Sequence, residues 1–153
     1  MTEIKKTVRL IFLDSYLTAI KNSVGANIFK TLWAEVDGQT EDILEGGKLS
    51  CASFVSGILA WFGLIKERHA TVAGTVRDMQ ASGWEVIPEP RPGCVLHWEK
   101  MKENGEHEHL GFYLGHDAAV SNSRTARTPI EHHWTYDGGR RVVAIYWHPR
   151  LNS

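Results

Sequence analysis

The spacing of the apolar residues changes once along this chain, near Trp84, and that change limits the folds open to it. Before Trp84 the apolar residues recur every three or four positions, which is the period of one face of a helix. After it, short runs rich in β-branched and aromatic residues are separated by proline, glycine and polar turns. Helical segments followed by strands predict an α+β fold with an antiparallel sheet.

Three segments have apolar residues at helical spacing and are predicted helices: 4–24, 51–62 and 72–82. The second follows Ser50, a favoured N-cap residue, so we expect a buried helix that begins at or beside Cys51 and holds Trp61 in the core. The polar stretch 37–48 is expected to be a loop. Five segments are predicted strands: 84–87, 95–98, 110–114, 118–121 and 141–147.

Length and charge exclude several classes of protein. A chain of 153 residues with 42% apolar and 23% charged residues fits a single globular domain, residues 1–153. Its 17 basic and 18 acidic residues leave a net charge of -1, without the positive field on which nucleic-acid binding depends, so no nucleic-acid partner is expected. The late basic cluster is interpreted as a solvated face: Arg124, Arg127, Arg140 and Arg141.

No segment predicts association with a membrane, because none approaches the roughly 20 apolar residues that cross a bilayer. The apolar run 8–13 is followed by Asp14 and has no small-residue cleavage site, so it predicts part of a helix and no signal peptide. The expected location is the cytoplasm by default, with export by a phage or secretion-system route as the alternative. The oligomeric state stays open.

Cys51 is the candidate nucleophile. A thiol attacks a carbonyl as the thiolate, and the unpaired N–H groups at a helix N-terminus lower the pKa of a thiol placed there. The backbone N–H of Cys51 is also placed to stabilise the oxyanion that forms on the attacked carbonyl. The alternative is that Cys51 is a small buried apolar residue. Whether it pairs with Cys94, the other cysteine, stays open.

His109 is the candidate base. It stands at the head of the alternating segment 109–115, where it can face a helix end, take the thiol proton and return it to the leaving amine. The turn that follows predicts a pairing that brings Ser121 or Asn122 near the imidazole. Asn122 is preferred on chemistry, because its amide oxygen can accept the ring N–H and hold the tautomer, whereas strand parity favours Ser121.

Three blocks of the sequence stand in a fixed order: 50–56 (SCASFVS), 91–98 (RPGCVLHW) and 109–115 (HLGFYLG). In order and spacing they resemble the NlpC-like and CHAP amidohydrolases and peptidases. The resemblance implies a papain-like fold, with N-terminal helices packed on a C-terminal antiparallel sheet, and a thiol protease or amidase that forms an acyl-enzyme on Cys51. Family members commonly cleave bacterial cell walls, which implies a peptide or peptidoglycan-like substrate. Cys94 stands where the family usually has Asp.

Other interpretations of the sequence concern metals, aromatic residues and loss of activity. Several histidines and glutamates lie between residues 97 and 133, but their spacings match no zinc motif, so neither a metal nor another cofactor is expected. Trp33 and Trp134 flank the three blocks and are the candidates for walls of a substrate cleft, together with Ser50. A catalytically silent binding module of the same fold is the alternative to an enzyme.

Overall fold

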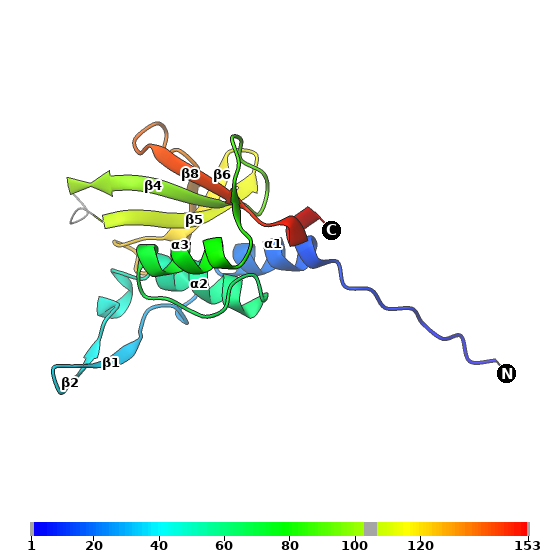
Figure 1. Ribbon diagram of the computed structural model, residues 1–153, viewed down its shortest axis with the longest axis horizontal. Coiled ribbons are helices and arrows are strands. Elements are labelled where there is room, and N and C mark those ends of the chain that lie inside the picture. Colours follow the sequence, from blue (N-terminus) through cyan, green and yellow to red (C-terminus); the bar gives the residue numbers. More distant parts are fainter. Residues whose placement is uncertain (1, 103–106, 153) are drawn as a thin grey trace.

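The computed structural model describes residues 2–102 and 107–152, and Figure 1 shows helices on one side of a sheet. The helices come first in the chain: α1 (Phe12–Asn22), α2 (Cys51–Trp61) and α3 (Val72–Ala81). The strands of the large sheet follow: β3 (Glu85–Val86), β4 (Val95–Met101), β5 (His107–Gly115), β6 (Ala118–Asn122), β7 (Pro129–His133) and β8 (Val142–Trp147). The predicted α+β class with an antiparallel sheet is confirmed.

The six strands are hydrogen-bonded in the order β3-β8-β4-β5-β6-β7, and each neighbouring pair is antiparallel. β5 therefore lies inside the sheet, between β4 and β6. The turn from β5 to β6 has positive φ at both His116 and Asp117, the geometry of a tight hairpin whose twist matches that of its strands. In this hairpin Gly111 pairs with Ser121.

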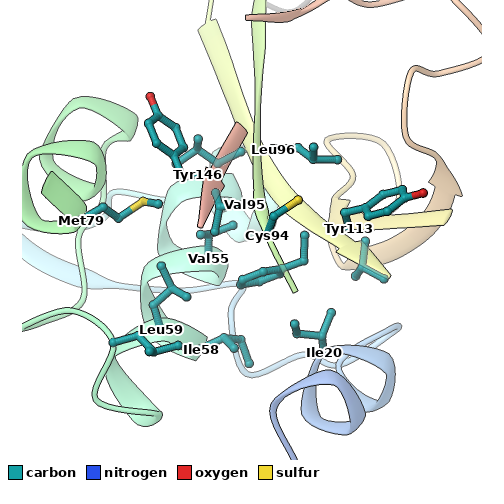
Figure 2. Packing of buried hydrophobic residues seen from close by; sticks show 14 of the residues in the cluster. Ile20, Val55, Ile58, Leu59, Met79, Cys94, Val95, Leu96, Tyr113 and Tyr146 are labelled. Carbon is teal, nitrogen blue, oxygen red and sulfur yellow. The ribbon is translucent and has the colours of Figure 1, made fainter. Parts of the chain in front are cut away.

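α2 packs against β5 and β6 and supplies much of the core. Phe54 and Val55 have no exposed surface, and Figure 2 shows Val55 of α2 close to Cys94 and the neighbouring residues of β4. Trp61 lies on the same helical face as Phe54, two turns later, but it is 75% exposed. The expectation that Trp61 lies in the core is wrong, because burial of this face ends before the last residue of α2.

The first helix is shorter than its apolar spacing predicts. α1 begins at Phe12 rather than Ile4, and Figure 1 shows the preceding segment extending away from the rest of the chain. Ile4 is 93% exposed, whereas Tyr16 and Ile20 of α1 are fully buried. The apolar period continues before Phe12, but no tertiary packing stabilises a helix there. None of the helices within the described ranges is long and apolar enough to span a membrane.

A small hairpin stands where the sequence predicts irregular structure. β1 (Trp33–Val36) pairs with β2 (Gln39–Asp42) in a separate two-stranded sheet. The two residues between them, Asp37 and Gly38, both have positive φ, so they form the Asp-Gly turn that favours tight hairpins. The expected loop 37–48 is therefore wrong over its first part. A short 3-10 helix, η1 (Glu45–Gly47), then leads the chain to Cys51.

Candidate active site

Cys51 and His109 line one pocket of about 660 Å³. Cys51 is the first residue of α2, and His109 lies near the start of β5, the strand against which α2 packs. The Cys51 Sγ lies 4.0 Å from the carbonyl oxygen of Glu108, the residue before His109. Among the described residues, no hydrogen bond joins the Cys51 thiol to the His109 imidazole. The structure thus brings the two groups into one space, with the thiol donating to the backbone of β5.

Ser50 occupies the N-cap position of α2 but makes no capping hydrogen bond through its side chain. It is fully buried, and its hydroxyl has no partner among the described residues. Ser50 is also not among the residues that line the pocket. The sequence therefore predicts the helix boundary correctly, whereas the structure places Ser50 behind the pocket wall rather than in a cleft.

Burial raises the pKa of the Cys51 thiol above its ordinary value. The backbone N–H groups of Leu110, Ala52 and Cys51 itself act in the opposite direction, because they stabilise the thiolate, and so does the positive charge of Arg140. The burial effect is the larger one. The lowering expected at a helix N-terminus is present in these N–H contacts, but the net direction is upward and the resting thiol is neutral.

The His109 imidazole is also neutral. Burial, followed by electrostatic interactions with Arg140 and His132, lowers the pKa of His109 to about 3. On β4, Trp98 is paired with His109, and the two ring centroids are 5.3 Å apart. Trp98 is fully buried, so it gives the imidazole an apolar wall. The ring therefore stays unprotonated throughout the neutral pH range.

Ser121, and not Asn122, contacts the imidazole. The Ser121 Oγ lies 2.9 Å from His109 Nε2, because Ser121 pairs with Gly111 and so lies on the same face of the sheet as His109. Asn122 points to the opposite face, where its amide N–H donates to the Gly47 carbonyl oxygen at 2.8 Å. The contact with the imidazole therefore follows strand parity, which favours Ser121, and not the chemical preference for Asn122.

The hydrogen bonds around Ser121 fix the protonation of two imidazoles. The Nδ1 of His132 lies 2.8 Å from the carbonyl oxygen of His133, which can only accept, so Nδ1 carries a proton. Burial lowers the pKa of His132, so its ring is neutral and its Nε2 accepts the Ser121 hydroxyl at 2.7 Å. That hydroxyl has one proton, so Ser121 accepts from His109 Nε2–H and from Tyr136 O–H, each at 2.9 Å. His109 therefore keeps its lone pair on Nδ1.

Gly111 makes this arrangement possible. A Cβ at Gly111 would lie 2.7 Å from the Ser121 Cβ, 2.7 Å from the Val120 carbonyl oxygen and 2.8 Å from the Trp98 ring. These distances are shorter than side-chain carbons tolerate, so a larger residue would push Trp98 or Ser121 away from the imidazole. The glycine of the His-x-Gly-x-Tyr pattern is thus explained by close packing beside His109.

Tyr136 and Arg140 come from the segment after β7, and neither was predicted to lie in the site. Arg140 is 7% exposed, so its interpretation as part of a solvated face is wrong. Its Nε donates to the Glu99 carbonyl oxygen and its Nη2 to the His107 carbonyl oxygen, each at 2.9 Å. The segment has no apolar period, and its one local signal is Asp137 before a glycine, which indicates a turn but no function.

The two tryptophans predicted as cleft walls lie elsewhere. Trp33 of β1 is 69% exposed, and Trp134 packs on Tyr113 with ring centroids 5.9 Å apart. Neither is among the residues that line the pocket of Cys51 and His109. The aromatic side chains close to the candidate base are instead Trp98 and Tyr136.

Cys94 takes no part in the pocket. It is fully buried in the core, and burial raises the pKa of its thiol to about 12. Both cysteines are free. Within residues 2–102 and 107–152, no group of three or more histidine, cysteine or carboxylate side chains could hold a metal ion.

Known proteins resemble this chain at the level of the fold. No family model matches the sequence, and no curated protein sequence matches it. Among solved structures the chain is similar to NlpC2 from Trichomonas vaginalis, with a TM-score of 0.54 and 15% sequence identity. The similarity covers 96% of this chain and 52% of the other, so this chain spans about half the length of the NlpC2 structure. At this identity the similarity supports an NlpC-like fold alone.

Proposed function

We propose that this chain is a papain-like cysteine hydrolase that cleaves an amide bond, with Cys51 as nucleophile and His109 as base. The observation that carries the proposal is the shared pocket, which has Cys51 at the start of a helix and His109 on the adjoining strand. The similarity in fold to NlpC2 supports a hydrolase. The resemblance of the three sequence blocks to NlpC-like and CHAP enzymes favours a peptide or peptidoglycan-like substrate.

In this mechanism both reacting groups start neutral. As the Cys51 sulfur attacks the carbonyl carbon, the His109 Nδ1 accepts the thiol proton, and the carbonyl oxygen becomes an oxyanion. The backbone N–H groups of Cys51 and Ala52, which lie at the start of α2 close to the sulfur, are the proposed donors for that oxyanion. Collapse breaks the C–N bond, His109 gives its proton to the amine, and water then hydrolyses the acyl-enzyme with His109 again as base.

Ser121 and His132 act in this proposal as positioning residues. Ser121 accepts the His109 Nε2–H, which keeps the basic lone pair on Nδ1, and His132 accepts the proton of Ser121. Of the two residues considered for this role, Ser121 is supported by its 2.9 Å contact with the ring. Asn122 instead holds the loop before α2 through its bond to Gly47.

The test is the rate of Cys51 alkylation by iodoacetamide across pH, in the wild type and in His109→Ala, with Cys94→Ser in both. The proposal expects rapid alkylation at neutral pH, because His109 takes the proton as the sulfur attacks, and a rate at least about tenfold lower in His109→Ala. Equal rates that rise only near the ordinary thiol pKa in both proteins would refute it. Hydrolysis of peptidoglycan fragments by the wild type, lost in Cys51→Ala, would then identify the bond.

The second candidate is a catalytically silent binding module of the same fold. The observation that favours it is the resting state of the thiol, which donates to the Glu108 carbonyl oxygen and has a raised pKa. A silent module would bind peptidoglycan fragments with the same affinity in the wild type and in Cys51→Ala, and would release no product. Binding by calorimetry together with product analysis separates the two functions.

A further inference from the structure

The pocket of Cys51 and His109 carries positive charge. Its walls include four basic side chains and one carboxylate: Lys48, Lys100, Arg124, Arg140 and Glu108. The chain as a whole is nearly balanced, with a net charge of -1, so basic residues are concentrated at this place. A cleft lined by one sign of charge raises the local concentration of ligands with the opposite sign.

Arg140 differs from the other basic residues of the pocket because it is buried, with 7% of its surface exposed. Two of the five N–H donors of its guanidinium are used by the Glu99 and His107 carbonyl oxygens, which leaves three. Its Nη1 has no hydrogen-bond partner, and no carboxylate lies within ion-pair distance of it, among residues 2–102 and 107–152. The Glu99 carboxylate compensates part of this charge from beyond that distance, and a buried cation is costly unless a ligand or another group compensates the rest.

The place of Arg140 is fixed and close to the reacting groups. Its two hydrogen bonds tie it to backbone of β4 and β5, so the guanidinium is already oriented before a ligand arrives. Arg140 lines the same pocket as Cys51 and His109, and its positive charge lowers the pKa of both groups. A group bound to Arg140 would therefore share the pocket with the amide that the Cys51 sulfur attacks.

We infer that Arg140 binds a carboxylate of the substrate close to the scissile amide, and that the pocket selects acidic peptides over their neutral counterparts. The planar guanidinium matches the geometry of a carboxylate and can donate two parallel hydrogen bonds to it. The inference rests on the proposed function for the scissile amide. Recognition of the carboxylate does not itself require turnover, so it can be measured separately.

The experiment compares the rates at which iodoacetate and iodoacetamide alkylate Cys51 in a Cys94→Ser background. These reagents share the same reactive carbon and differ in a carboxylate against a neutral amide. N-acetylcysteine in the same buffer gives the reference ratio of the two rates. We expect the ratio for Cys51 to exceed the reference by about tenfold or more, as one charge-assisted hydrogen bond contributes. Arg140→Gln should lower the ratio by about the same factor.

Arg141→Gln is the matched control. Arg141 is the next residue, its side chain is 75% exposed, and its Nε pairs with Glu99 at 3.5 Å, so the variant makes the same change in net charge outside the pocket. The ratio in Arg141→Gln should equal that of the parent protein. An equal fall in both variants would overturn the inference, because it would show only a diffuse field.

The ratio of the iodoacetate rate to the iodoacetamide rate in the parent protein tests the inference even if Arg140→Gln does not fold. A ratio equal to that of N-acetylcysteine overturns the inference. Failure of the proposed function has a different signature. If His109→Ala leaves the iodoacetamide rate unchanged while the ratio stays high, the hydrolase is refuted and the carboxylate site stands.

Discussion

Replacing Gly111 by alanine is expected to destabilise the protein by about 2 kcal/mol. The added Cβ would meet three atoms at 2.7 to 2.8 Å, and one of them, the Val120 carbonyl oxygen, belongs to the backbone of the neighbouring strand. Another belongs to Trp98, which is fully buried and so can move only by displacing its neighbours. Overpacking of this kind costs up to about 3 kcal/mol, and the lower backbone entropy of alanine in the unfolded chain returns at most about 1 kcal/mol.

Gly57→Ala is the matched control, since it makes the same chemical change in the interior of α2. A Cβ at Gly57 would meet the Phe29 ring at 3.5 Å and Arg68 Nε at 3.9 Å, which are ordinary contacts. Without a clash, alanine should stabilise the helix by about 0.5 to 1 kcal/mol. The two substitutions are therefore expected to change the free energy of unfolding in opposite directions.

The assay is urea unfolding followed by tryptophan fluorescence. With a slope of about 2 kcal/mol per molar urea, Gly111→Ala should lower the midpoint by about 1 M, and Gly57→Ala should raise it by a few tenths. Gly111→Ala should also slow alkylation of Cys51, because Ser121 is displaced from the base. A midpoint within about 0.2 M of wild type for Gly111→Ala would show that the strands move apart easily. It would refute the explanation that close packing beside His109 requires a glycine at position 111.

Three further predictions concern His109, its partner Ser121 and the loop after α2. Ser121→Ala removes the acceptor of His109 Nε2–H, so the alkylation rate of Cys51 at pH 7 should fall by about tenfold with little change in the free energy of unfolding. An unaltered rate would show that Ser121 is not required to hold the tautomer of His109. The free energy of unfolding should fall as the pH is lowered from about 6.5 towards 3, because the unfolded chain protonates His109 while a folded pKa of about 3 keeps the ring neutral. Urea titrations at several pH values should show a flatter curve for His109→Gln, and an identical curve would count against a buried neutral ring. Asp78→Ala should lower stability by about 2 kcal/mol, because Asp78 accepts two backbone N–H groups of the loop after α2 and contacts His69 at 2.6 Å; a thermal midpoint equal to wild type would contradict this.

The sequence predicts the helix that begins at Cys51 and the strand that carries His109 well, for local reasons. Cys51 begins a helix because a long polar stretch gives way there to continuous apolar residues, and that change is visible in the printed chain. His109 stands on a strand whose apolar residues alternate up to a turn at His116 and Asp117. Period and turn chemistry depend on neighbours in sequence, so they need no knowledge of tertiary contacts.

What surrounds these two residues depends on tertiary pairing, and there the predictions fail. The preference for Asn122 followed the chemistry of the amide, but the face of a strand is set by register with its partner. His132 and Arg140 lie in segments without an apolar period, so neither burial nor proximity to the base could be predicted. The predicted start of the first helix at Ile4 is wrong for the reverse reason. The apolar period is present there, but the packing that would stabilise a helix is absent among the described residues.

The order in which these contacts occur along the chain has a consequence for biosynthesis. The helix that carries Cys51 is translated early. The groups that orient His109, which are Ser121, His132 and Tyr136, follow later with β6, β7 and the segment after them. Cys51 is therefore translated before the residues that hold its proposed base in place. Under the proposed mechanism, hydrolytic competence therefore begins only when β6, β7 and the segment after them have joined the fold beside β5.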